Sequence, residues 1–133
     1  MENEGHDNKI NDYRDLKVWQ AGMDLAANVY SATRTFPREE AFGMTSQMRR
    51  AAASIPANIA EGFGREQRQP FIQFLRISQG SLKELETHAL LAHRVGLLTE
   101  IAAKQISRDC EELGKMLRAF IRRLQEKKAE RTK

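Results

Sequence analysis

The stretch MTSQMRRAAASIPANIAEGFGR, residues 44–65, decides the fold because it combines an apolar stripe with a proline and two glycines. Its stripe recurs at steps of three and four residues and consists of Met44, Met48, Ala52, Ile55, Ile59 and Phe63. This spacing keeps the side chains on one helical face and predicts a helix that packs into a core. Pro56 lacks a backbone donor and crowds the carbonyl of Ala52, so we expect a kink there, or a break restarted by Ser54 as a cap.

Small residues surround that proline. The run from Ala51 to Ser54 has only small side chains, which let a neighbouring backbone approach, so we expect a crowded helix contact beside Pro56. Gly62 and Gly64 are expected to end the helix, because glycine relieves the left-handed backbone strain at a helix C-terminus.

The same stretch carries a family resemblance. Residues 45–52 (TSQMRRAA) and 54–62 (SIPANIAEG) resemble the signature of the four-helix-bundle proteins encoded in intervening sequences of bacterial 23S ribosomal RNA genes. Residues 15–21 (DLKVWQA) resemble the opening of that family, and residues 74–75 (FL) with 80–87 (GSLKELET) resemble its third helix. The similarity extends over residues 13–98.

The resemblance implies more than a fold. The family is similar in fold to the accessory protein of diversity-generating retroelements, a pentameric bundle that binds nucleic acid and a reverse transcriptase. It therefore implies a homopentamer, an RNA or DNA ligand and a reverse-transcriptase-like protein partner.

Length and composition place limits on the class of protein. At 133 residues the chain is expected to form one domain around a single core. Cys110 is its one cysteine, so no intramolecular disulfide is possible. The first 17 residues are polar, and the uncharged run of residues 51–60 is far shorter than the roughly 20 residues that span a membrane. We predict a cytoplasmic protein without a membrane partner.

Positive charge is concentrated near the C-terminus. The net charge is +4, but residues 115–133 contain eight basic and two acidic residues, a balance of +6 that leaves −2 for residues 1–114. Such a cluster attracts phosphate backbones or an acidic partner. The alternative is a solvated helix end whose cations complement the helix dipole.

A first helix is expected over residues 15–36, ending before Pro37, which disfavours helical geometry in the residue before it. The main apolar stripe, which we expect in the core, is Leu16, Trp19, Met23, Ala26 and Tyr30. A second stripe, about a third of a turn away, is Val18, Leu25, Val29 and Phe36. This wide apolar arc requires two burial partners.

A third helix is expected from Pro70, well suited to a first helical turn, to about Arg94. Its core stripe is Phe71, Leu75, Ser78, Leu82, Leu85, Ala89 and Ala92. A second stripe, around Ser81 and His88, is Phe74, Ile77, Leu91 and Val95. Gly80 falls opposite the core stripe, where it either lets another chain approach or is simply tolerated at a cost of about 1 kcal/mol.

Gly96 is expected to end the third helix and Thr99 to cap the fourth. The fourth helix has a coiled-coil-like seam and is expected to fray after Gln125; the seam is Ile106, Cys110, Leu113, Leu117, Phe120 and Leu124. The sequence predicts an all-α, antiparallel up-down four-helix bundle over residues 13–126, between a disordered tail (1–12) and a basic tail (127–133). The excess apolar arcs favour a homo-oligomer, either a ring or a dimer.

No cofactor or metal site is predicted. His88 and His93 are five residues apart and diverge around the helix, while Glu84 and His88 supply only two ligands. Cys110 belongs to the seam and is expected to act as a small hydrophobe. The Gly62–Arg65 turn follows a helix, not the strand that nucleotide-binding loops require. We therefore do not expect an enzyme.

Basic residues on helix faces favour nucleic-acid binding through phosphate contacts, and structured RNA or duplex is favoured because exposed aromatic residues are scarce. The candidate contact residues are Arg49, Arg50, Arg65, Arg68, Lys115, Arg118, Arg122, Arg123, Lys127 and Lys128. The alternative is a protein-interaction scaffold that docks an acidic or apolar partner surface without nucleic acid.

Overall fold

The computed structural model describes residues 10–132, with side chains described to Glu126, and its described residues form helices and turns without a strand. The long helices are α1 (Lys17–Ala32), α2 (Met44–Gly64), α3 (Arg68–Arg94) and α4 (Glu100–Thr132). Two short 3-10 helices, η2 (Tyr13–Asp15) and η3 (Arg38–Glu40), precede α1 and α2. The predicted all-α class is confirmed.

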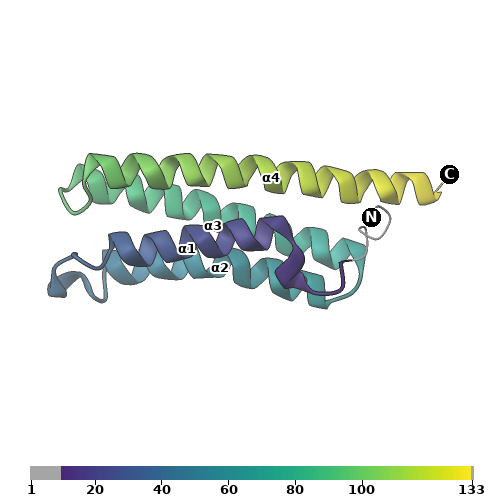
Figure 1. The fold of residues 1–133 in the computed structure, drawn as a ribbon, viewed down its shortest axis with the longest axis horizontal. Helices are drawn as coiled ribbons and strands as arrows, with labels where there is room; N and C mark the ends of the chain where they lie inside the picture. The colour runs from purple at the N-terminus through teal and green to yellow at the C-terminus, as the bar shows by residue number, and fades with distance from the viewer. Residues whose placement is uncertain (1–9, 133) are drawn as a thin grey trace.

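The four helices run alternately up and down (Figure 1). Each helix packs against the next one in sequence, and α4 closes the bundle by packing against α1. At the end where α1 begins, α4 projects beyond the other three helices (Figure 1). It continues to Thr132, past the residue at which we expected it to fray.

The two predicted tails lie largely outside the described residues. Of the expected disordered tail, residues 1–9 are not described, while Asp12 caps η2 by accepting a hydrogen bond from the Arg14 backbone N–H at 2.8 Å. Of the expected basic tail, the backbone to Thr132 belongs to α4 and the side chains lie outside the described part. The domain limits therefore stay predictions.

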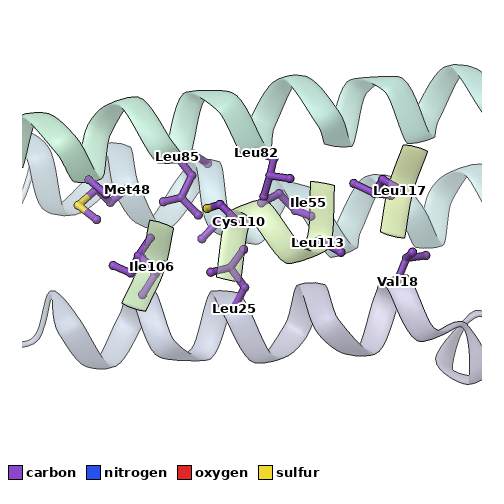
Figure 2. Packing of buried hydrophobic residues seen from close by; sticks show 14 of the residues in the cluster. Val18, Leu25, Met48, Ile55, Leu82, Leu85, Ile106, Cys110, Leu113 and Leu117 are labelled. Carbon is purple, nitrogen blue, oxygen red and sulfur yellow. The ribbon is translucent and has the colours of Figure 1, made fainter. Parts of the chain in front are cut away.

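Side chains from all four helices meet in one core. Leu25 of α1, Ile55 of α2, Leu85 of α3 and Leu113 of α4 are each at most 2% exposed and point between the helices (Figure 2). Burying a leucine or isoleucine side chain contributes about 1.5–3 kcal/mol. The core is therefore the main source of stability, and it fixes which face of each helix remains outside.

Helix α2 passes through Pro56 without interruption, so the alternative of a break capped by Ser54 is wrong. Side chains bind the carbonyls that precede the proline. The Ser54 hydroxyl hydrogen-bonds the Ala51 carbonyl at 3.3 Å, and the Asn58 amide donates to the Ser54 carbonyl at 2.8 Å. These side-chain bonds add to the backbone hydrogen bonds of α2 beside Pro56, but neither reaches the Ala52 carbonyl, whose usual helical donor the proline lacks.

The expected crowded contact lies at this proline. The Cα of Gly22 on α1 faces Pro56, since a Cβ added to that glycine would lie 3.5 Å from ring atoms of Pro56 and from Ile55. On the α3 side, the buried Ser78 hydroxyl donates to the Ile55 carbonyl at 2.8 Å. Small residues therefore let α1 and α3 approach α2 closely at the same level.

Gly62 serves a different purpose from the one predicted. It is buried in the last turns of α2, and a Cβ there would come within 2.6 Å of the Phe74 Cβ and 3.0 Å of Phe71 on α3. The residue with left-handed geometry is Glu66, at φ 60°, beyond Gly64. Gly62 is therefore required for close packing of α2 on α3. The left-handed residue after the end of α2 is Glu66, which is not a glycine.

The predicted core stripe of the first helix is partly wrong. Met23 and Tyr30 are 45% and 43% exposed, whereas the stripe that we ranked second is buried, as Val18, Leu25, Val29 and Phe36. Helix α1 also ends at Ala32, before the expected limit. A single helix presents both stripes equally, and only the positions of α2 and α4 select the buried one.

The core face of α3 agrees with the prediction, whereas that of α4 agrees only up to Leu117, because Phe120 and Leu124 are half-buried and Ile121, outside the predicted seam, is 3% exposed. Except for Phe71, which is half-buried, the core stripe of α3 is fully buried, and the helix begins two residues before Pro70. Gly96 has φ 86° and ends the helix in a Schellman motif, with the Leu97 N–H donating to the Ala92 carbonyl at 2.8 Å. Thr99 caps α4, because its hydroxyl accepts a hydrogen bond from the Ala102 N–H at 3.1 Å.

Candidate nucleic-acid interface

Three arginines meet in a shallow groove between α3 and α4. This basic groove holds about 170 Å³ and is lined by Arg76 and Gln79 of α3 and by Arg118, Ile121, Arg122 and Gln125 of α4. Its lining contains no carboxylate and no aromatic ring. Three permanent positive charges and two amide groups therefore surround one small space.

Helix periodicity explains why these side chains share the groove. On α4, Arg118, Arg122 and Gln125 follow at steps of four and three residues, which places them along one face. Arg76 and Gln79 are three residues apart on α3 and face the same groove. Leu75 of α3 and Leu117 of α4 are buried in the core beneath the groove, and Figure 2 shows Leu117 among the core side chains.

The three guanidinium groups have no anionic partner among the described side chains. No described carboxylate lies within ion-pair distance of Arg76, Arg118 or Arg122, and none of the three donates a hydrogen bond to a described residue. Arginine stays charged at all physiological pH values. The groove is thus a concentration of uncompensated positive charge that attracts an anion.

Arg118 and Arg122 are the predicted residues that the structure brings together, and Arg76 was missed. In the sequence Arg76 is a single charge in the apolar run FIQFLRIS, distant from the basic C-terminal segment. Its position opposite Arg118 follows only from the packing of α3 against α4. The signal that was available is its place at the edge of the apolar face of α3. Arg76 lies one helical turn after the buried Ile72 and directly after the buried Leu75, so it borders the neighbouring helix.

Arg49 stabilises the bundle instead of facing a ligand. Its Nε donates to the Thr33 hydroxyl at 2.8 Å, and its Nη2 donates to the Tyr30 carbonyl at 3.3 Å. The guanidinium also lies 4.5 Å from the centroid of the Tyr30 ring. Arg49 therefore binds the C-terminal end of α1, whose last carbonyls lack intrahelical donors.

Two further predicted residues are engaged elsewhere. Arg65 forms an ion pair with Glu61 at 3.1 Å and lies 5.0 Å from the Phe74 ring centroid. Arg50 lines a separate pocket between α2 and α3, together with Glu84. Glu61 pairs with Arg65, Glu84 lines the same pocket as Arg50, and neither arginine lines the basic groove.

The remaining predicted residues surround the groove or lie away from it. Lys115 is exposed on α4, three residues before Arg118 and on the same side of the helix. Arg68 is half-buried at the first residue of α3. Arg123 faces α1, with its guanidinium 5.6 Å from the Phe120 ring centroid. The side chains of Lys127 and Lys128 lie outside the described part of the chain.

A second groove lies on the other side of α4, where it meets α1. This acidic groove holds about 190 Å³, and three of its lining residues are the carboxylates Asp24, Asp109 and Glu112. Asp109 accepts hydrogen bonds from the Asn28 amide at 3.3 Å and from the Gln105 amide at 2.9 Å. The acidic groove on the α1 side of α4 therefore repels phosphates, while the basic groove on the α3 side attracts them.

The described residues offer little for catalysis or metal binding. Cys110 is 1% exposed, and burial, followed by the charges of Glu86 and Asp109, raises its pKa to about 12. Its thiol therefore stays protonated and apolar, as predicted. Among the described residues no group of three potential ligands is close enough to hold a metal ion, and no described helix has the length and apolarity needed to cross a membrane.

His88 and Glu84 pair along α3, as expected for residues four apart. The His88 Nε2 lies 3.5 Å from a Glu84 carboxylate oxygen, and it is buried without a well-oriented hydrogen bond in the described structure. Two side chains do not complete a metal site. The pair is a polar contact on the face of α3 that packs toward α2.

Apolar residues are exposed at the end of the bundle where α3 joins α4. Leu90, Leu91, Val95 and Ile101 are 46–82% exposed, and Leu90 and Leu91 line a pocket of about 280 Å³. Ile77, 50% exposed, extends the apolar face along α3 beside Gly80, which has open space around its Cα. Gly80 therefore faces outward, as predicted.

Comparison with known families and structures places the fold. The model of a family described as 23S rRNA-intervening sequence protein matches residues 14–119, which include Arg76 and Arg118 but not Arg122. The chain is similar to a crystal structure of a protein with unknown function, from the S23 ribosomal protein family, from Bacteroides thetaiotaomicron VPI-5482. The identity is 27% and the TM-score 0.73, covering 79% of this chain and 95% of that one. A search of curated proteins finds no match.

Proposed function

The chain belongs to the 23S rRNA-intervening sequence protein family, and we propose that it binds nucleic acid, without catalysing a reaction, through the basic groove between α3 and α4. The observation that supports this most directly is the meeting of Arg76, Arg118 and Arg122 in a groove that contains no carboxylate. Planar guanidinium groups suit phosphate oxygens, which they bind through paired N–H donors.

The lining of the groove favours backbone recognition. Its polar groups are arginine and glutamine side chains, and it has no aromatic ring on which a base could stack. Single-strand binding proteins use such rings for a large part of their affinity. Structured RNA or duplex DNA, which present ordered phosphates, are therefore the proposed ligands.

The family resemblance adds partners to this proposal. A homo-oligomer, such as the implied pentamer, would repeat the basic groove and multiply weak contacts through multivalency. The exposed Met23, Tyr30 and Ile77 offer apolar surface for contacts between subunits. A cytoplasmic location and a reverse-transcriptase-like protein partner belong to the same proposal.

The second candidate function is a protein-interaction scaffold without nucleic acid. The exposed residues Leu90, Leu91, Val95 and Ile101 favour it, because a concentration of large apolar side chains on a surface is typical of protein interfaces. Arg94 lies beside the pocket that Leu90 and Leu91 line, which suits an apolar partner segment with an acidic neighbour.

A salt titration separates the two functions. Binding of the purified protein to a structured RNA and to a duplex DNA would be measured between about 50 and 500 mM salt, with subunit number checked by light scattering. We expect tight binding at low salt and a steep loss at high salt, because bound phosphates release counterions. Docking through apolar surface depends much less on salt.

A neutralised variant assigns the binding to the groove. Arg118→Gln combined with Arg122→Gln is expected to reduce affinity about tenfold or more. Arg108→Gln is the matched control, since this exposed arginine on the same helix lies about 15 Å from Arg118 along the axis. Absence of binding to either nucleic acid at low salt would discard the proposal and favour the scaffold.

A further inference from the structure

We infer that the basic groove holds a phosphate monoester, such as the 5′-phosphate end of an RNA strand, in preference to an internal phosphodiester. The inference rests on the proposed nucleic-acid function and names the chemical group that the groove takes. It follows from the charge of the groove, from its size and from the arrangement of its donors.

The charges match a dianion better than a monoanion. Arg76, Arg118 and Arg122 bring three positive charges to the lining of one groove, and no carboxylate lines it. An internal phosphodiester carries a single negative charge, whereas a phosphate monoester carries about −1.5 to −2 at neutral pH and has three strong acceptor oxygens. A monoester therefore neutralises the groove more completely than a diester does.

The donors come from two helices that face one groove. A row of diesters along a strand is matched by basic residues that follow one another along a surface, each close to its own phosphate. Here Arg76 and Gln79 on α3 face Arg118, Arg122 and Gln125 on α4 across one groove. Donors on the two sides of one groove can bind different oxygens of one terminal phosphate, which offers more free oxygens than a diester does.

The size of the groove fits a single group. Its volume of about 170 Å³ is that of a shallow depression open to solvent. Such a depression can seat one phosphate group with part of its hydration. Ile121, which is 3% exposed, forms an apolar part of the wall and limits the access of water from the core side.

The chain attached to the phosphate would continue along α4. Lys115 is exposed on the same side of the helix as Arg118 and can meet the next phosphates of the strand. This adjoining positive surface favours a nucleic-acid end over a free nucleotide or a phosphorylated peptide, because a longer polyanion gains contacts that a small ligand lacks.

A pair of matched RNAs tests the inference. Two hairpin RNAs of one sequence, labelled at the 3′ end, differ only in a 5′-phosphate or a 5′-hydroxyl, and their dissociation constants are measured by fluorescence anisotropy. We expect the phosphorylated strand to bind about tenfold more tightly, because charge-assisted hydrogen bonds to the extra oxygens are lost with the hydroxyl end.

Variants of Arg76 connect the preference to the groove. Arg76→Gln is expected to reduce the preference for the phosphorylated end to about threefold or less, and Arg76→Lys to restore it in part, because lysine keeps the charge but lacks the planar fork. The control Arg108→Gln should keep the full preference. Circular dichroism confirms that each variant retains its helical content.

A pH series gives an independent readout. The second ionisation of a phosphate monoester has a pKa of about 6, while a phosphodiester and an arginine do not titrate nearby. Lowering the pH from about 7.5 to about 5 should therefore reduce the preference for the phosphorylated end without abolishing it, because the monoester loses one of its two negative charges. Binding of the 5′-hydroxyl strand should follow the same course in wild-type protein and in Arg76→Gln.

The outcomes separate this inference from the proposed function. Equal binding of the two strands overturns the inference and leaves nucleic-acid binding in place, whereas binding of neither strand removes both. A nucleoside monophosphate that competes as well as the phosphorylated strand would overturn the assignment to a strand end. A phosphorylated peptide that binds more tightly than the RNA would do the same.

Discussion

The two grooves beside α4 have similar volumes and opposite charge. The basic groove, of about 170 Å³, is formed with α3 and contains three arginines, and the acidic groove, of about 190 Å³, is formed with α1 and contains three carboxylates. One helix supplies residues to both grooves, from faces on its two sides. The difference therefore depends on charge placement around a single helix and not on groove size.

This comparison shows how little net charge says about binding. The total of +4 is modest, yet the two grooves beside α4 differ in sign, with three arginines in one and three carboxylates in the other. A helix with side chains is about 10 Å in diameter, similar to the Debye length of about 8–10 Å at physiological salt. A polyanion at the α3 side is thus partly screened from the acidic groove, and we expect it to approach the protein mainly from that side.

Reversing the basic groove should have the largest effect. Arg118→Glu combined with Arg122→Glu would give both grooves the same sign, and we expect nucleic-acid affinity to fall about 100-fold, or ~2.7 kcal/mol, at low salt. The measurement is a filter-binding titration with a structured RNA and a duplex. Arg108→Glu is the control for charge alone. Retained affinity in the double variant would mean that the ligand binds elsewhere.

Neutralising the acidic groove should have a smaller effect of opposite sign. Asp24→Asn combined with Asp109→Asn removes two negative charges, and the side-chain carbonyl that the second substitution introduces can still accept a hydrogen bond. We expect affinity to rise about threefold at low salt and to return to the wild-type value near 0.5 M salt, as screening predicts. A rise that persists at high salt would indicate new direct contacts, which contradicts a purely long-range role.

A single neutralisation should change the salt dependence slightly. Arg76→Gln is expected to reduce the slope of log affinity against log salt by about 0.7–0.9, the value of one phosphate contact. Asp109→Asn should leave the slope unchanged, since no phosphate is bound in its groove. The slopes are obtained from the same titrations. An equal slope in wild type and Arg76→Gln would exclude a direct contact of Arg76 with phosphate.

Titration of Cys110, on the inner face of α4, should have the smallest effect on binding. It should instead change the free energy of unfolding. The pKa of Cys110 is raised from 9.0 to about 12, chiefly by burial, so the folded state holds the proton more tightly than the unfolded state does. The corresponding stability is present below pH 9.0, and it is lost as pH rises from 9.0 toward about 12. Denaturant midpoints across this range would measure the loss.

The reactivity of the Cys110 thiol provides a second readout. A thiol reagent should label it only at the rate of local opening, because the folded thiol is 1% exposed and protonated. Labelling should be equally slow in the variants of the two grooves. Fast labelling of the folded wild-type protein would contradict the burial of this side chain.

The fold was predictable because every long helix carries a clear apolar stripe. In α4, Ile106, Leu113 and Leu117 follow the seam that the sequence showed, and all three are buried. In α1 two stripes compete, so that Met23 and Tyr30 were assigned to the core although they are exposed. Periodicity identifies an apolar face, but it does not identify which neighbouring helix covers that face.

The candidate site was less predictable, because it depends on pairs of helices. Arg118 and Arg122 were identified from the basic C-terminal segment, but Arg76 becomes their neighbour only when α3 packs against α4. Arg49 had the same appearance in the sequence as these residues, and its contacts with Thr33 and Tyr30 are visible only in the structure. Sequence spacing gives the direction of a side chain along one helix and not its partners.

The closure of α4 onto α1 also bears on the order of folding. Helices that follow each other in sequence form hairpins with short loops, so the α3–α4 pair and its basic groove can assemble early. The acidic groove joins the first helix to the last, with Asn28 and Asp109 81 residues apart, and its loop-closure entropy is correspondingly greater. The packing of α1 on α4 is the least extensive in the bundle, so hydrogen exchange should reveal this seam as the first to open and the last to close.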